Sequence, residues 1–224
     1  GLETAYLRLS DIDAHFYDVD LPEVIDLRKE LLPSSERESL IAEDLFDMRW
    51  ADEVDGSLPV MILVLGVFQY YHEEQILDAV KKMKRLFPGA ELVFDATTTD
   101  GLKYAARYVR KTGNQSAAMY FAVDDAQAFC EMAETGYLEC RPFFTDARVM
   151  LRRRVGFYTR LAMRVVDRDF RVKLIRLRLR RSPGWRTVSP FDQILDQPGF
   201  VPEESANVGV LRDPNSPEPP SERI

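Results

Sequence analysis

The sequence has little cysteine and little histidine, with two of each among 224 residues. Two cysteines, Cys130 and Cys140, cannot form the disulfide framework of a small secreted domain, so we expect two reduced thiols in a cytoplasmic protein. No group of histidines and cysteines has the spacing of metal ligands, and we therefore predict no metal site. The longest apolar run, at residues 58–68, is shorter than the ~20 residues of a membrane span, so no membrane association is expected.

Several common site motifs are also missing. The sequence contains no G-x-S-x-G nucleophile motif, no phosphate-loop lysine motif and no G-x-G-x-x-G turn, so hydrolases and nucleotide sites built on those motifs are not predicted. The chain does not open with a basic and then apolar stretch, so no signal peptide is predicted. It begins with Gly1 instead of methionine, which leads us to expect that the first residues of the natural protein are missing.

The charges are unevenly distributed. The formal net charge is −7, yet residues 141–181 carry 14 lysines and arginines against three acidic residues, a net charge of +11. The rest of the chain therefore carries −18. Such a segment can bind nucleic acid or an anionic surface, or it can pack against the acidic body. Because no nucleic-acid-binding motif is present, we expect a solvated helix and a strand that face the acidic body.

Strands and helices alternate along the first 180 residues. The helix over residues 21–32 has Val24, Leu27 and Leu31 on one face. The run at 60–65 is apolar without alternation, as in a strand covered on both faces of a parallel sheet. This order predicts an α/β fold with a doubly wound sheet. The expected strands are 14–19, 40–42, 60–65, 91–94, 137–144 and 172–180, the last with one charged face near a sheet edge, and the expected helices are 21–32, 73–87, 100–110, 124–134 and 147–166.

Acidic residues stand at the ends of several of these strands. Asp18 and Asp20 end the first, Asp44 follows the second, and Asp95 ends the strand after the apolar run. Ligands of open α/β sheets bind outside the carboxyl ends of the strands, and a carboxylate offers two acceptor oxygens to a ribose diol. Gly1 precedes Asp20 by 19 positions, close to the ~20 expected between a nucleotide-binding glycine turn and the ribose acid. The pattern is typical of a nucleotide site, although strand-end acids are also commonly just solvated.

Five stretches of the sequence together resemble one family. They are similar to the S-adenosylmethionine-dependent methyltransferases of the leucine carboxyl methyltransferase type, and among those to the polyketide O-methyltransferases of the tetracenomycin type. The family motifs read roughly G-L-D-T-R, Y-x-V-D-L-P, a D-L pair and E-G-V-x-x-Y, and they occur here in the same order within residues 1–180. The stretches are GLETAYLRL, HFYDVDLPEVIDLRKELLP, IAEDLFDMRWADEV, PVMILVLGVFQYYHEEQ and FPGAELVFDA.

The resemblance implies a Rossmann-like class I methyltransferase sheet with helices on both faces, in which the first strand and the N-terminal cap are missing. The methyltransferase domain would comprise residues 1–181 and be incomplete at its N-terminus. Residues 182–224 would form a proline-rich and largely disordered tail. That segment holds eight of the 13 prolines in the chain, and such a composition cannot bury enough apolar surface to fold.

The resemblance also implies S-adenosyl-L-methionine as the cofactor and assigns the residues that bind it. Gly1 would lie beside the methionine part, and Gly66 near its amino-acid end. Asp20 would hold the ribose hydroxyls, with Asp18 as a substitute. The two remaining residues would bind the adenine: Asp44 would accept from its amino group, and Leu45 would place its amide close to the ring.

The implied reaction is methyl transfer to a carboxylate or hydroxyl oxygen of a small molecule, polyketide-like or another secondary metabolite. The protein mainly aligns the acceptor oxygen with the methyl group, and a base helps only when the acceptor is a hydroxyl. Tyr70 would line the substrate side and His72 would be that base. The alternative for Leu45 and Tyr70 is plain packing. For His72 the alternatives are capping of the next helix and a side chain that is simply solvated.

Two departures from the family motifs keep other functions open. Ala5 stands where the family has arginine, and Leu65 where it has glutamate. An ammonium once paired with that glutamate would lose a charge-assisted bond of ~1.5–3 kcal/mol. The alternatives are a degenerate or truncated paralogue without catalysis, and a binding module that uses the basic surface.

Overall fold

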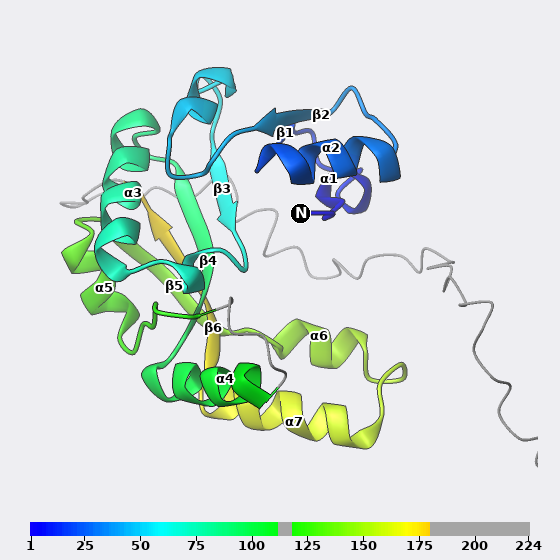
Figure 1. Ribbon diagram of the computed structural model, residues 1–224, viewed down its shortest axis with the longest axis vertical. Coiled ribbons are helices and arrows are strands. Elements are labelled where there is room, and N and C mark those ends of the chain that lie inside the picture. The colour runs from blue at the N-terminus through cyan, green and yellow to red at the C-terminus, as the bar shows by residue number, and fades with distance from the viewer. Residues whose placement is uncertain (112–117, 180–224) are drawn as a thin grey trace, which may run out of the picture.

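The computed structural model describes residues 1–111 and 118–179. Their strands form two sheets (Figure 1). The first sheet is a parallel pair, and in the second the last strand in sequence runs antiparallel to both of its neighbours. The pair consists of β1 (Phe16–Asp20) and β2 (Glu38–Ala42), and the larger sheet has the order β3 (Met61–Val64), β4 (Glu91–Thr97), β6 (Val172–Arg178) and β5 (Gly136–Pro142).

The helices around the larger sheet lie in two groups. In Figure 1, α3 and α5 lie together on one side of the larger sheet, whereas α4, α6 and α7 gather beyond one of its ends. Two short 3-10 turns, η1 (Arg49–Glu53) and η2 (Phe68–Tyr70), follow β2 and β3. The helices are α1 (Ala5–Arg8), α2 (Pro22–Leu31), α3 (Glu73–Leu86), α4 (Thr99–Lys111), α5 (Ala126–Met132), α6 (Thr145–Met150) and α7 (Phe157–Arg168).

The predicted alternation of strands and helices is confirmed, and each predicted strand overlaps an observed one. Among the described residues β1 and β3 do not pair, so the sheet is interrupted between them. The absence of a first strand and an N-terminal cap stays a prediction. The proline-rich tail predicted over 182–224 lies outside the described residues.

The single helix predicted over 147–166 is wrong, because the chain forms two helices there. α6 ends at Met150 and α7 begins at Phe157, with a turn between them that contains three consecutive arginines. Gly156 occupies the N-cap position of α7 with φ −65° and ψ 164°, an extended backbone that cannot continue a helix. The segment was predicted as one long basic helix because of its many arginines, so the break between the two helices was not predicted.

The strand predicted near a sheet edge is also placed differently. β6 lies between β4 and β5, and its charged face is neutralised inside the fold. Nε of Arg176 and Nη2 of Arg178 each donate to the carboxylate of Glu91 over 2.7 Å. Glu91 is almost fully buried, and two guanidinium partners offset the cost of removing its charge from water. This cluster confirms in part that the basic segment packs against acidic residues of the body.

Two expectations about buried faces are wrong. In β3 the side chains of Ile62 and Val64 are buried, but Leu63 is 54 % exposed, so the described residues cover only one face of the strand. In α2 the expected apolar face stays in solvent, with Leu27 and Leu31 45 % and 59 % exposed. The helix turns Ile25 and Arg28 inward instead, because Arg28 meets two carboxylates of the first sheet.

The remaining composition-based expectations concern cysteines, membranes and metals. Cys130 and Cys140 are both free, which agrees with reduced thiols. None of the described helices is both long enough and apolar enough to cross a bilayer. The described residues contain no cluster of three or more side chains that could hold a metal ion.

The contact between α4 and the end of β4 leaves no space for a side chain at Gly101. A Cβ atom there would lie 2.1 Å from Oγ1 of Thr97 and 2.7 Å from the carbonyl oxygen of Arg171. We expect Gly101→Ala to lower the free energy of unfolding by about 1–3 kcal/mol, as overpacking does. Chemical denaturation measures the change. Gly56→Ala is the control, since its Cβ would meet only the Phe87 ring, at 3.9 Å; equal stability of the two variants would contradict the close approach.

Candidate active site

Parallel pairing brings the strand-end residues to common edges. Asp20 is the last residue of β1 and lies opposite Ala42, the last residue of β2. The amide of Glu43 donates to the carbonyl oxygen of Asp20 over 3.0 Å, which places Asp44 just beyond the same edge. In the larger sheet, the amide of Gly66 after β3 donates to Oδ1 of Asp95 near the end of β4, over 2.6 Å.

Aromatic packing joins these two edges. The Phe46 ring, from the loop after β2, lies 4.1 Å from the Tyr71 ring and 6.4 Å from the Phe68 ring, both from the segment after β3. Burial and the nearby Asp44 carboxylate raise the pKa of Tyr71. The loop after β2 and the segment after β3 therefore pack against each other.

The structure brings Gly1 and Asp20 together. The amino group of Gly1 contacts Oδ2 of Asp20, and the amide of Leu21 donates to Oδ1 over 2.8 Å. A Cβ atom on Gly1 would meet no atom within 4 Å, so there is open space beside it. The roles predicted for them, Asp20 on the ribose hydroxyls and Gly1 beside the methionine part of the cofactor, stay predictions.

Asp18 is engaged differently, because it binds a buried cation. The Arg28 side chain is 1 % exposed and donates to Asp18 over 2.8 Å, to Glu38 over 2.6 Å and to the carbonyl oxygen of Gly1 over 2.9 Å. Burial raises the pKa of Asp18 to about 6, with Glu38 acting in the same direction and Arg28 opposing. Asp18 thus holds the first sheet to α2, which favours Asp20 as the ribose ligand.

Asp44 and Leu45 form a tight turn after β2. Oδ1 of Asp44 accepts from the amide of Phe46 over 2.8 Å, and the residue is exposed. The carbonyl oxygen of Leu45 accepts from Nε1 of the buried Trp50 over 2.9 Å, and its half-buried side chain packs against the core. The packing alternative for the Leu45 side chain is therefore realised, while its amide and the Asp44 carboxylate remain at the edge of the sheet.

The segment after β3 contains three of the predicted site residues, Gly66, Tyr70 and His72. The space beside Gly66 is open. Gly66 has φ +72°, and a Cβ atom there would meet nothing within 4 Å. Tyr70 ends η2 and is 42 % exposed. His72 is the N-cap residue of α3, its amide donates to Oε1 of Gln75 over 3.0 Å, and its ring lies 4.3 Å from that of Tyr120. The capping alternative for His72 is thus realised at its main chain.

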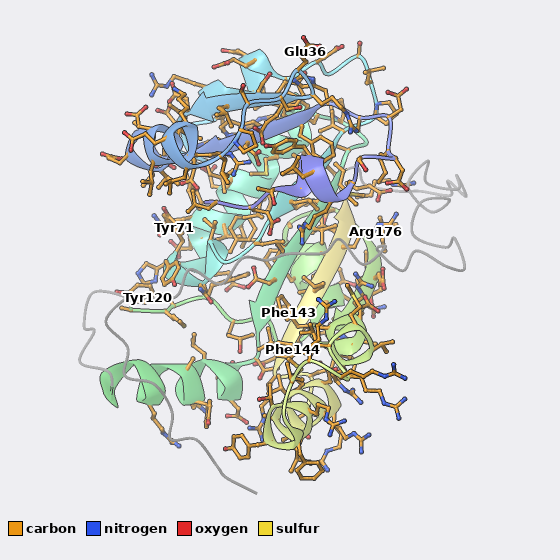
Figure 2. All side chains as sticks on the ribbon, turned by 90° about the vertical axis from the view of Figure 1, so that its right-hand side faces the viewer. Glu36, Tyr71, Tyr120, Phe143, Phe144 and Arg176 are labelled. Carbon is orange, nitrogen blue, oxygen red and sulfur yellow. The ribbon has the colours of Figure 1, made fainter. Side chains whose placement is uncertain are left out.

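A cavity of about 540 Å³ opens at the carboxyl end of β4. Its wall is largely apolar and comes from β4, α4 and α7, with aromatic side chains from several segments. Figure 2 shows one of these rings, Phe144, beside Phe143 where the chain leaves β5 for the following helices. Gln69, Asp95 and Thr97 add polar groups to the lining, which includes neither Tyr70 nor His72. The lining aromatic side chains are Tyr104, Phe121, Phe144 and Tyr158.

Most of this cavity was not predicted from the sequence. Asp95 was noted as a strand-end acid without a role, and the segment of α7 was interpreted by its charges. A signal was present, because Leu161, Ala162 and Val165 recur at helical spacing between the arginines. All three line the cavity, so the apolar stripe of α7 was the feature that could have revealed it.

The comparison with curated proteins confirms the resemblance inferred from the sequence. Over 116 residues the chain is 28 % identical to the tetracenomycin polyketide synthesis O-methyltransferase of Streptomyces glaucescens. The match covers 50 % of this chain and 43 % of that enzyme, so the chain spans less than half the length of its curated relative. No protein-family model matches the sequence.

A solved structure supports the fold. A DUF574 family protein from Streptomyces avermitilis superposes with a TM-score of 0.51 and 16 % identity, over 78 % of each chain. An O-methyltransferase family 2 protein from Planctomyces limnophilus, solved with apigenin, gives a TM-score of 0.45 and 18 % identity over 73 % of this chain and 43 % of its own. The predicted Rossmann-like class I methyltransferase fold is confirmed.

The Asp18 cluster predicts a pH dependence of stability. Because the pKa of Asp18 is raised to about 6 in the folded chain, its ionisation costs more there than in the unfolded chain. The stabilisation is present at low pH and is lost as the pH rises through about 6. In Asp18→Asn, which cannot ionise, we expect the fall in unfolding free energy between about pH 5 and about pH 7.5 to be smaller by about 1 kcal/mol, a value reduced for partial exposure.

Denaturant titrations at the two pH values measure this difference. Glu30→Gln, which removes an exposed carboxylate from α2, the helix that carries Arg28, is the control and should keep the wild-type dependence. An Asp18→Asn variant with an unaltered pH profile would show that the carboxyl group is not perturbed by its burial.

Proposed function

We propose that the chain is part of an S-adenosylmethionine-dependent O-methyltransferase that acts on a carboxylate or hydroxyl of a small molecule. One observation supports this most: Asp20, Asp44 and Gly66 stand at the ends of three successive strands, and the Gly66 amide donates to Asp95, which lines an apolar cavity at the end of the fourth strand, β4. Extended ligands of open α/β sheets bind along this edge. The confirmed fold and the similarity to a polyketide O-methyltransferase support the same activity.

The residues at this edge fit the cofactor chemically. Both oxygens of the partly exposed Asp20 carboxylate already accept, Oδ2 from the Gly1 amino group and Oδ1 from the Leu21 amide, and each oxygen has a second lone pair for a ribose hydroxyl. Oδ1 of Asp44 is held by the Phe46 amide, which orients the carboxylate so that Oδ2 can accept from an exocyclic amine. The open space beside Gly66 admits the amino-acid end without a clash. When bound, the cofactor supplies an electrophilic methyl group on a positively charged sulfur.

The cavity beside this edge provides the acceptor site. Its volume of about 540 Å³ lies within the range of about 300–1,000 Å³ typical of small-molecule pockets. Apolar walls from α4 and α7 orient a flat molecule, while polar side chains at the end of β4 fix its reacting oxygen. Such positioning is the main contribution that a protein makes to an in-line displacement. The similarity to a polyketide enzyme supports a polyketide-like acceptor.

Cofactor affinity tests the assignment of Asp20. We expect Asp20→Ala to weaken S-adenosylmethionine binding by about 10- to 100-fold, since a charge-assisted hydrogen bond to the ribose contributes about 1.5–3 kcal/mol. Isothermal titration calorimetry on the 224-residue chain measures the affinity. Asp26→Ala, which removes an exposed carboxylate of α2 paired with Lys29, should bind like the wild type.

Two outcomes would count against the proposal. Equal affinity of wild type and Asp20→Ala would reject Asp20 as the ribose ligand. An absence of heat with both S-adenosylmethionine and its demethylated product would favour a non-catalytic paralogue instead.

A further inference from the structure

We infer that Asp95 is the catalytic base of this site and that the acceptor is therefore a hydroxyl on a flat apolar molecule, not a carboxylate. The inference rests on the proposed function and selects between its two acceptor classes. It comes from three features of the cavity: the fixed orientation of Asp95, the state of the neighbouring charges, and the apolar walls that face it.

The orientation of Asp95 is set by the loop after β3. Its Oδ1 accepts from the amide of Gly66 over 2.6 Å, whereas its Oδ2 has no hydrogen-bond partner among the described residues. The side chain is half-buried and lines the cavity. One carboxylate oxygen is thus anchored beside the expected cofactor edge, and the other is free to accept from a bound molecule. A base must be held in this way, within hydrogen-bond reach of the proton that it removes.

The charges around the cavity disfavour an anionic acceptor. Two charged side chains, Asp95 and Arg171, contribute to its lining. The Arg171 guanidinium is already paired, since its Nη2 lies 2.9 Å from Oδ2 of Asp169. A carboxylate in the cavity would meet the Asp95 carboxylate without an unpaired cation from the described lining. A hydroxyl would instead donate to Asp95, so the same charge repels one acceptor and binds the other.

The position of Asp95 also bears on a departure from the family motif. Where the family has glutamate, this chain has Leu65, directly before Gly66. Asp95 brings a carboxylate from the neighbouring strand to the amide of that Gly66. The end of β3 therefore keeps an adjacent negative charge, displaced toward the acceptor cavity, where it serves proton transfer.

The acceptor O–H gives its proton to Oδ2 of Asp95 as the oxygen forms a bond to the methyl carbon. A bound cofactor would supply the methyl group and would keep the electron pair of the broken carbon–sulfur bond on its sulfur, as a neutral thioether. The products are a methyl ether, the demethylated cofactor and protonated Asp95, which then releases its proton to water.

Binding of two matched probes tests the inference without cofactor and without turnover. At neutral pH 2-naphthol keeps its proton, whereas 2-naphthoate is ionised, and the two share one ring system. We expect the 224-residue wild type to bind 2-naphthol about tenfold or more tightly than 2-naphthoate. In Asp95→Asn, whose side-chain oxygen can still accept from Gly66, this preference should fall to about threefold or less, mainly because naphthoate binding improves.

Fluorescence titration of both probes gives the four affinities. Asp78→Asn is the control, since it removes one exposed carboxylate on α3 and lies outside the cavity lining; it should keep the wild-type preference. Thermal unfolding shows whether each variant is folded, and the wild-type preference tests the inference even if Asp95→Asn does not fold.

The inference is overturned if wild type binds 2-naphthoate as well as 2-naphthol, if it binds neither, or if folded Asp95→Asn keeps the full preference. S-adenosylmethionine calorimetry on the same samples separates this result from the proposed function. A probe preference that depends on Asp95 in a chain without cofactor affinity would uphold the hydroxyl site and reject the methyltransferase.

Discussion

The candidate site depends on one constraint, the parallel pairing of β1 with β2 and of β3 with β4. Parallel strands end at the same edge, so residues far apart in sequence meet there without any side chain having to reach across the fold. The Gly66 to Asp95 hydrogen bond exists because both residues lie at such an edge. An antiparallel arrangement of β3 and β4 would place the two residues at opposite ends of the sheet and separate the cofactor edge from the cavity.

The buried Arg28 gives Asp18 and Asp20, two acidic residues of β1, different surroundings. Asp18 and Asp20 lie two residues apart on β1. From the sequence, either carboxylate is suited to bind the ribose hydroxyls. Burial of the Arg28 guanidinium requires carboxylate partners, and Asp18 and Glu38 lie on the strands beside it. Asp20 lies at the end of the strand beyond this cluster. The stability of the sheet and the availability of Asp20 thus have one cause.

Helices and strands were predictable from the sequence where a local residue pattern determines them. The candidate site was predictable only in part. The amphipathic pattern of residues 73–87 and the apolar run at 60–65 identified α3 and β3, and strand-end acids led to Asp20 and Asp44. The sequence could not show that Arg176 and Arg178 would meet Glu91, because that ion cluster joins residues more than 80 positions apart. The acceptor cavity was hidden for the same reason, since α4, α7 and β4 meet only in the folded chain.

The apolar lining of the cavity gives Asp95 its selectivity. A charge in surroundings of low dielectric interacts more strongly with its neighbours than the same charge in water. An ionised acceptor would lose its hydration on entry and gain repulsion, whereas a hydroxyl loses one hydrogen bond to water and regains one to the carboxylate. The walls from α4 and α7 therefore do more than shape the cavity. They amplify the discrimination that a single carboxylate on β4 exerts, so that the choice of acceptor follows from where the helices pack.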